Sequence, residues 1–138
     1  MPSHRFRLLP GDYCIAKLPP GAEVPMAQVQ TSFHSVTRTA DETSVICETR
    51  LAPPGAELSL GWRAIALIGP FPFEATGVLA SVVAPLAEAC ISVMAIATYE
   101  TDYVFVPSPN CQPPSQRWSR RGISWRMGDP PISNRSLP

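Results

Sequence analysis

Histidine is scarce in this chain of 138 residues, which has only two, His4 and His34. A serine or cysteine nucleophile needs a base such as histidine that a third group orients, and two isolated histidines do not suggest such an arrangement. The sequence also lacks the GxSxG, HExxH, GxxxxGK[ST] and GxGxxG patterns. We therefore expect a protein that is not an enzyme and that uses no cofactor.

Cysteine pairs with metal-binding or redox spacing are also missing. The four cysteines, Cys14, Cys47, Cys90 and Cys111, are far apart in the sequence and include no CxxC. Arginine and proline interrupt the N-terminal segment MPSHRFRLLPGDY, where a secretory signal would need a continuous apolar run. The cysteines are therefore expected to be reduced core residues of a cytoplasmic protein, without a metal site.

Neither charge nor hydropathy favours a nucleic acid or a membrane as partner. The formal net charge is +0. After Val106 the only acid is Asp129, whereas this segment has five arginines, Arg117, Arg120, Arg121, Arg126 and Arg135. Scattered arginines in a Pro/Ser-rich segment are typical of a solvated tail. Residues 75–98 contain only one charge, but Gly77 and Pro85 and a change of periodicity argue against a membrane span.

The first part of the chain predicts strands rather than helices. Residues 12–18 are suited to a strand, and residues 33–39 and 43–47 alternate around a turn as a hairpin does. A short, poor helix is expected at residues 23–30. A linker at residues 51–55 ends this first unit, which we assign to residues 1–55.

The second part predicts a strand followed by a helix. Residues 62–68 are apolar on both faces, as in a central strand, and the prolines of residues 69–73 end it. Thr76 is a suitable N-cap. The helix after it has one apolar stripe, formed by Val78, Leu79, Val82, Val83 and Leu86.

Two more strands are predicted at residues 91–99 and 102–106, giving a β-α-β-β order. A second helix at residues 111–121 and a last strand at 123–127 would complete a split β-α-β plan over residues 56–127. Residues 128–138 (GDPPISNRSLP) are expected to be disordered.

The start of the predicted helix is the best candidate for a binding site. The N–H groups of Gly77 and Val78 would lack partners within the helix, and the helix dipole favours an anion there. Asp102, in the neighbouring hairpin, could pair with an ammonium or guanidinium. Together they would suit a zwitterionic amino acid. Alternatively, the three residues have only structural roles. Gly77 then lets the helix pack on the sheet, Thr76 caps the helix, and Asp102 shapes the turn.

Several segments resemble the ACT domain superfamily, and more closely the CASTOR-like tandem ACT proteins related to an arginine sensor. These segments are FHSVTRTADETSVICE, GWRAIALIGPFPF, the helix start Gly77-Val78-Leu79, and PLAEACISVMAIATYETDYVFV. The resemblance implies an α+β fold of tandem ferredoxin-like (βαββαβ) units. The first unit would be incomplete, with antiparallel sheets and helices on one face.

The same resemblance implies a non-catalytic regulatory domain that binds an amino acid and forms a homodimer through sheet or helix faces. By matching position it implies a set of ligand-binding residues: Ser44, Val45, Gly77, Val78, Leu79, Thr98, Tyr99 and Asp102. The alternative is a structural or dimerisation module whose ligand site is vestigial. Cys90 occupies a position where these proteins often have a helix-ending glycine, so we expect a strained left-handed residue or a shifted cap there.

Overall fold

The computed structural model describes residues 6–25, 30–68 and 77–108. The chain divides into two compact units, unit 1 with Met1–Pro10 and Arg63–Pro138, and unit 2 with Gly11–Trp62. Strand β5 (Glu57–Leu67) contributes its first part to unit 2 and its second part to unit 1. The helix predicted at residues 111–121, the strand at 123–127 and the tail at 128–138 lie outside the described residues.

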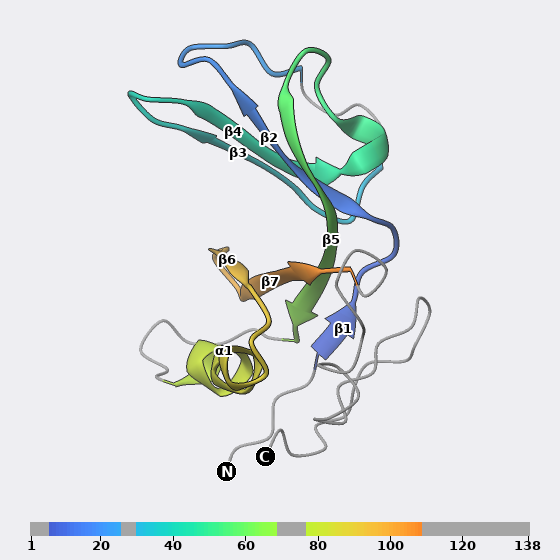
Figure 1. The fold of residues 1–138 in the computed structure, drawn as a ribbon, viewed down its shortest axis with the longest axis vertical. Coiled ribbons are helices and arrows are strands. Elements are labelled where there is room, and N and C mark those ends of the chain that lie inside the picture. Colours follow the sequence, from blue (N-terminus) through green and yellow to red (C-terminus); the bar gives the residue numbers. More distant parts are fainter. Residues whose placement is uncertain (1–5, 26–29, 69–76, 109–138) are drawn as a thin grey trace. The chain divides into compact units, whose positions relative to one another are not determined.

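Unit 2 is an antiparallel sheet in the order β3-β4-β2-β5 (Figure 1). Its strands are β2 (Tyr13–Leu18), β3 (His34–Arg38), β4 (Thr43–Glu48) and the first part of β5, and a short 3-10 turn, η1 (Thr49–Leu51), follows β4. The predicted first strand and hairpin are confirmed. Of the predicted helix at residues 23–30, residues 23–25 and 30 are not helical, and residues 26–29 lie outside the described part.

One face of the unit 2 sheet carries its core. Cys14, Ala16, Val45 and Cys47 are buried there, because residues paired across β2 and β4 point to the same side. The two thiols lie opposite each other with their Sγ atoms 3.9 Å apart. Burial, and then the neighbouring Cys14, raises the pKa of Cys47 to about 12. Both residues therefore fill the core as thiols, as the sequence predicts, whereas the same prediction is wrong for Cys90, which is exposed, and Cys111 lies outside the described residues.

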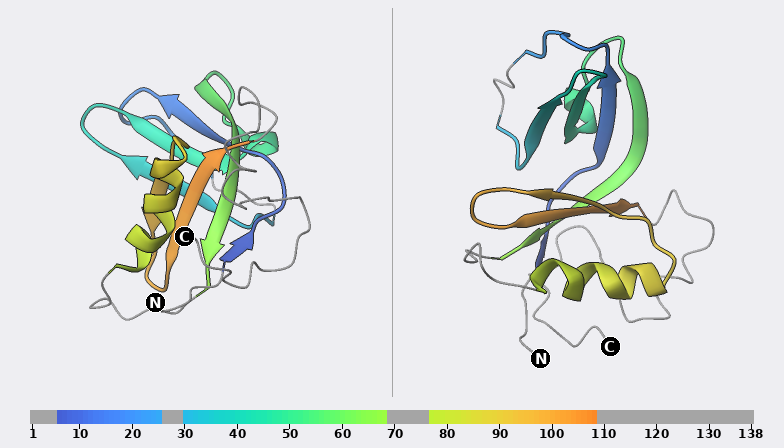
Figure 2. Two further views of the ribbon diagram at one scale, coloured as in Figure 1. Left: turned by 60° about the horizontal axis from the view of Figure 1, so that its bottom comes forward. Right: turned by 90° about the vertical axis from the view of Figure 1, so that its left-hand side faces the viewer.

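From the second part of β5 onward, unit 1 has the order β-α-β-β. Its further elements are β1 (Phe6–Leu8), α1 (Val78–Glu88), β6 (Met94–Ala97) and β7 (Asp102–Pro107). Strands β6 and β7 form an antiparallel hairpin, and α1 lies along one face of it (Figure 2). The strand, helix and hairpin predicted for this part of the chain are all present, and β5 begins five residues earlier than predicted.

The predicted apolar stripe of α1 packs onto the unit 1 sheet. Val82 and Leu86 are buried in one cluster with residues of β1, β5 and β7, namely Phe6, Ile65, Leu67, Val104 and Val106. Val78, Leu79 and Val83 pack at its margin. The N-cap is Gly77, so the helix begins one residue later than predicted. Thr76 lies outside the described residues.

Strand β1 is an element that the sequence pattern did not predict. It pairs with the second part of β5, with Phe6 opposite Leu67 and Leu8 opposite Ile65. Strand β7 is the other neighbour of β5 in unit 1, so both edges of β5 are occupied there. A ferredoxin-like plan would place its last strand, predicted at residues 123–127, at the edge that β1 takes. Strand β1 has only three residues, which are too few to show an alternating pattern in the sequence.

The end of α1 is a Schellman motif with cysteine in the position that favours glycine. The N–H of Cys90 donates to the carbonyl of Ala87 at 2.9 Å, and the N–H of Ile91 donates to that of Leu86 at 2.9 Å. Cys90 has a φ of 59°, in the left-handed region where a Cβ atom is unfavourable. The strained left-handed residue expected from the sequence is therefore present.

A cluster around Glu48 ties the start of β3 to η1 in unit 2. The Glu48 carboxylate accepts hydrogen bonds from the Thr31 hydroxyl and, at 3.2 Å, from the Arg50 guanidinium. Arg50 also donates to the carbonyl of Gln30 at 3.0 Å. The Thr31 hydroxyl bond and then Arg50 lower the pKa of the Glu48 carboxyl, although burial acts in the opposite direction.

We expect Cys90→Gly to stabilise the protein by roughly 1 kcal/mol, because glycine adopts a positive φ without the Cβ penalty. Thermal unfolding of the variant and of Cys90→Ala measures this. Alanine keeps the Cβ atom, so its melting temperature should stay near that of the wild type. An equal rise in both variants would show that loss of the thiol, rather than relief of strain, is responsible.

Glu48 should make stability depend on pH in the acid range. A carboxyl whose pKa is lowered by folding contributes stability above its unfolded value of about 4.3, and loses it as pH falls through the folded value. Glu48→Gln should therefore lower the free energy of unfolding at pH 7 and reduce its fall below pH 4.5. Denaturant unfolding at several pH values checks this, with Glu42→Gln, in the exposed β3–β4 turn, as the control. Parallel curves for wild type and Glu48→Gln would contradict it.

Candidate functional site

The start of α1 presents an open backbone. Gly77 has a φ of 75°, and, its two chain neighbours aside, no atom of the described residues lies within 4 Å of a Cβ atom built on it. The first helical bond runs from the N–H of Ser81 to the carbonyl of Gly77 at 3.0 Å. The N–H groups of Val78 and Leu79 precede it and have no acceptor within the helix. These donors and the positive end of the helix dipole favour an anion.

Val78 and Leu79 have half-buried side chains. Both side chains pack at the margin of the unit 1 core, on the side of the helix that faces the sheet. The first turn of α1 contains no acidic side chain that would compete for the exposed donors. Of the three predicted residues at the helix start, Gly77 is therefore the one that leaves space above the backbone.

The β6–β7 turn is held by the hydroxyl of Thr98. The N–H and the Oγ1 of Thr98 both donate to the carbonyl of Thr101, at 2.8 and 3.0 Å, and the N–H of Thr101 donates back to Thr98 Oγ1 at 3.3 Å. Thr101 Oγ1 donates to the carbonyl of Leu67 at 2.8 Å, which attaches the turn to the end of β5. The proton of the Thr98 hydroxyl is thus used within the turn.

Asp102 starts β7 on the side of the sheet that α1 covers. It alternates with Val104 and Val106, which pack in the core beneath α1, and its Cα partner is Ala97. The side chain is half-buried, and among the described residues no basic group forms an ion pair with it. Tyr99, at the tip of the turn, is 79% exposed.

The helix start and the turn lie at the same end of unit 1. Strand β6 follows α1 and runs back along it, so the β6–β7 turn returns to the end where α1 begins, as Figure 2 shows. The backbone donors of Gly77, Val78 and Leu79 are therefore at the same end as Thr98, Tyr99 and Asp102. This arrangement follows from the β-α-β-β order of the chain.

Ser44 and Val45 belong to unit 2 and face opposite sides of its sheet. Val45 is 0% exposed and is part of the unit 2 core. Ser44 points to the other face, where its Cα partners are Lys17 of β2 and Thr37 of β3. Only Ser44 of this pair presents its side chain outside that core. Lys17 is a cation directly beside it that the sequence pattern alone did not connect with Ser44.

No group of three or more His, Cys, Asp or Glu side chains in residues 6–25, 30–68 and 77–108 is arranged to hold a metal ion. Over the same residues, no helix has the length and apolar character needed to cross a bilayer.

Comparison with protein families divides the chain in two. A model described as an ACT domain matches residues 57–112, and a model of an N-terminal domain matches residues 11–53. No match was found among curated proteins. The ACT match begins at the first residue of β5, and it includes α1 and the β6–β7 hairpin, so all the candidate residues of unit 1 lie within it.

Solved structures that are similar to this chain include the following three. A Vibrio cholerae protein of unknown function has 24% sequence identity and a TM-score of 0.61, over 87% of this chain and 84% of that one. An aspartate kinase from Clostridium acetobutylicum, described as an allosteric enzyme, has 12% identity and a TM-score of 0.53 over 76% of this chain. This match spans only 31% of the kinase. Both likenesses concern the fold alone.

The third structure has a higher identity. An Agobacterium tumefaciens protein, solved by X-ray crystallography, is 32% identical with a TM-score of 0.71, over 80% of this chain and 82% of that one. The match to the ACT domain model, rather than this structure, suggests a regulatory role in which a small molecule is bound. The chain belongs to the same family as the Agobacterium tumefaciens protein, and it contains an ACT domain.

Proposed function

We propose that this protein is a non-catalytic regulator whose ACT domain binds an amino acid between the start of α1 and the β6–β7 turn. The observation that carries the proposal is the position of the helix start and of Asp102 at one end of unit 1. A zwitterion has one negative and one positive group. The helix start would bind the negative group, and the Asp102 carboxylate would bind the positive one. We place this regulator in the cytoplasm.

Each half of the proposed site, the helix start and Asp102, would recognise one charged group of the ligand. The ligand carboxylate accepts hydrogen bonds from the backbone N–H groups of Val78 and Leu79, over Gly77, whose missing side chain leaves the approach open. Asp102 accepts a hydrogen bond from the ligand's ammonium or guanidinium. Such charge-assisted bonds contribute about 1.5–3 kcal/mol each.

The proposal includes a second ACT-like unit in tandem. Unit 2 has three complete strands and part of β5 but only a 3-10 turn besides, so it is an incomplete counterpart of unit 1 within the described residues. Of the two predicted ligand residues in unit 2, Ser44 is the one whose side chain lies outside the unit 2 core. Binding would act by changing contacts between subunits of a homodimer, a linkage between a site and an interface.

A structural module with a vestigial site is the alternative, and two observations favour it. The Thr98 hydroxyl proton is already donated within the turn, and the Val45 side chain is buried in the unit 2 core. Neither would then be available to a ligand. In this case the protein would have no affinity for amino acids, and its function would lie in the surfaces that it offers to other chains.

A thermal-shift screen of the twenty amino acids separates the two functions. Ligand at a hundred times its dissociation constant should raise the free energy of unfolding by about 2.7 kcal/mol, because it binds only the folded state. We expect at least one amino acid to raise the melting temperature in a concentration-dependent way. If none does so at millimolar concentration, the amino-acid proposal is wrong and the structural alternative holds.

Asp102→Asn should weaken binding of the amino acid found in that screen roughly tenfold or more, because the neutral amide loses a charge-assisted bond of about 1.5–3 kcal/mol. Isothermal titration calorimetry measures the affinity, and circular dichroism checks that the fold is retained. Glu100→Gln removes an exposed acid two residues away and is the control, with affinity near that of the wild type. Equal affinities in wild type and Asp102→Asn would exclude Asp102 from the site.

A further inference from the structure

Cys14 and Cys47 form a buried pair of thiols in unit 2. They are Cα partners on β2 and β4, both residues are 0% exposed, and their Sγ atoms are 3.9 Å apart. In the sequence the two residues are 33 positions apart. Neither is among the candidate ligand residues. The sheet therefore brings together two nucleophilic groups for which the candidate ligand site has no use.

The register places the two cysteines at a separation that a disulfide can span. The N–H of Thr49 donates to the carbonyl of Asp12 at 2.8 Å, two positions along the same ladder. Hydrogen-bonded pairs alternate along an antiparallel ladder, so Cys14 and Cys47 are also a hydrogen-bonded pair, with Cα atoms about 5.5 Å apart. Disulfides usually join Cα atoms that are about 4.4–6.8 Å apart.

Only the two side chains must move for an S–S bond to form. The Sγ atoms have to approach from 3.9 Å to about 2.05 Å. Rotation about the Cα–Cβ bonds brings the sulfurs together, and the backbone can stay in place because its separation already suits the bond. The product has two hydrogen atoms fewer than the two thiols, so it fits a core that already holds both sulfurs.

The surroundings of the pair favour an uncharged product. Burial, and then the neighbouring Cys14, raises the pKa of Cys47 to about 12. A metal ion binds thiolates, and this environment disfavours a thiolate. A disulfide has no charge, and Ala16 and Val45, which share the core cluster with the pair, are apolar. Oxidation rather than metal binding is therefore the chemistry that suits these two thiols.

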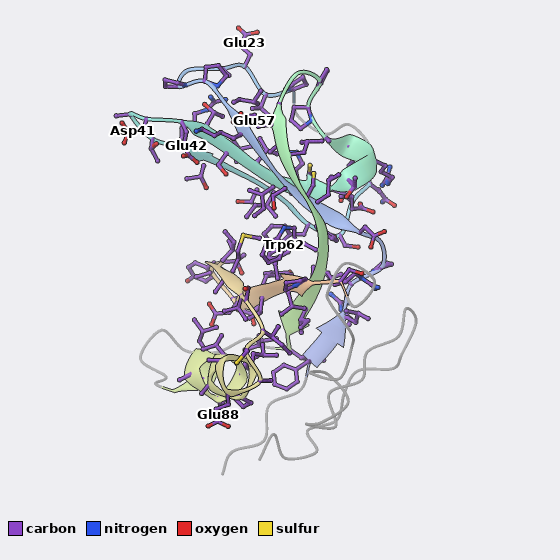
Figure 3. The ribbon with its side chains drawn as sticks, viewed as in Figure 1. Glu23, Asp41, Glu42, Glu57, Trp62 and Glu88 are labelled. Atoms are coloured by element: carbon purple, nitrogen blue, oxygen red, sulfur yellow. The ribbon has the colours of Figure 1, made fainter. Side chains whose placement is uncertain are left out.

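We propose that Cys14 and Cys47 are a reversible redox site, at which a small peroxide such as hydrogen peroxide converts the two thiols into a disulfide between β2 and β4. The loop that this bond closes contains β3 and the β3–β4 turn, where Figure 3 labels Asp41 and Glu42. The bond ties both ends of this segment together covalently. The proposal does not depend on what unit 1 binds.

The reaction balances with peroxide as the only other reactant. During a transient opening of the sheet, one sulfur attacks a peroxide oxygen as a thiolate, the O–O bond breaks, and hydroxide leaves with a proton as water. The sulfur is then a sulfenic acid. The second thiol attacks this sulfur, forms the S–S bond and displaces a second water. Two thiols and one hydrogen peroxide thus give one disulfide and two waters, and the sulfurs lose two electrons to the peroxide.

Peptide mapping of the full chain after treatment with hydrogen peroxide tests the proposal. Free thiols are blocked, and digestion after lysine and arginine then places Cys14 in peptide 8–17 and Cys47 in peptide 39–50. We expect the two peptides to appear joined, with a mass two hydrogens below their sum, and to separate after treatment with dithiothreitol. If they stay separate after peroxide treatment of the folded protein, the proposal is overturned.

The other possible pairings are the internal control for this map. Cys90 and Cys111 share a third peptide, 64–117, so a bond from either of them to Cys14 or Cys47 gives a different mass. In the folded protein the Cys14–Cys47 bond should exceed these pairings severalfold. In urea this excess should be lost, because the sheet no longer holds the two cysteines together. Equal yields of all pairings in the folded protein would contradict the proposal.

Thermal unfolding gives a second readout. A disulfide that closes a loop of this length should raise the melting temperature by roughly 10 °C, and dithiothreitol should reverse the rise. Cys47→Ala should show no rise after peroxide treatment, whereas Cys90→Ala, the matched control, should show the full rise. An equal rise in Cys47→Ala, or no rise in the wild type, would overturn the proposal. If Cys47→Ala does not fold, the peptide map of the wild type still decides.

Discussion

The packing of one apolar stripe of α1 on the unit 1 strands determines where the candidate site lies. Val82 and Leu86 are buried against strand residues such as Ile65 and Val104, and each buried aliphatic side chain contributes about 1.5–3 kcal/mol. Each hydrogen bond in the β6–β7 turn contributes only about 1 kcal/mol net. Helix packing therefore fixes the direction of α1. The weaker hydrogen bonds fix only the local conformation of the β6–β7 turn.

The two ends of α1 differ in how their backbone groups are satisfied. At the C-terminal end, the bonds from Cys90 and Ile91 satisfy two carbonyls, even though Cys90 is strained in the left-handed region. At the N-terminal end, Gly77 provides no side-chain cap, and its position is open. Among the described residues, no side chain caps the first N–H groups of α1, so its free hydrogen-bonding capacity lies at the end that also has Asp102.

Much of this fold could be predicted from residue patterns, because period-two and period-3.6 patterns report directly on burial. The hairpin of β3 and β4, the stripe of α1 and the strand β7 were predicted in this way. Strand β1 has only three residues, and the early start of β5 is exposed, so neither gives a burial pattern. The common end of α1 and Asp102 follows from chain order, whereas the cross-strand neighbours of Ser44, Lys17 and Thr37, needed the register.

The central claim is that an amino acid binds at the end of unit 1 that has both the start of α1 and the β6–β7 turn. The most direct measurement is a titration of the ¹⁵N-labelled protein with amino acids, followed by the amide signals in NMR spectra. The account predicts that the largest shifts occur at Gly77, Val78 and Leu79 and at residues 98–102, and that they saturate together. Saturating shifts confined to other residues, or no shifts with any amino acid, would contradict it.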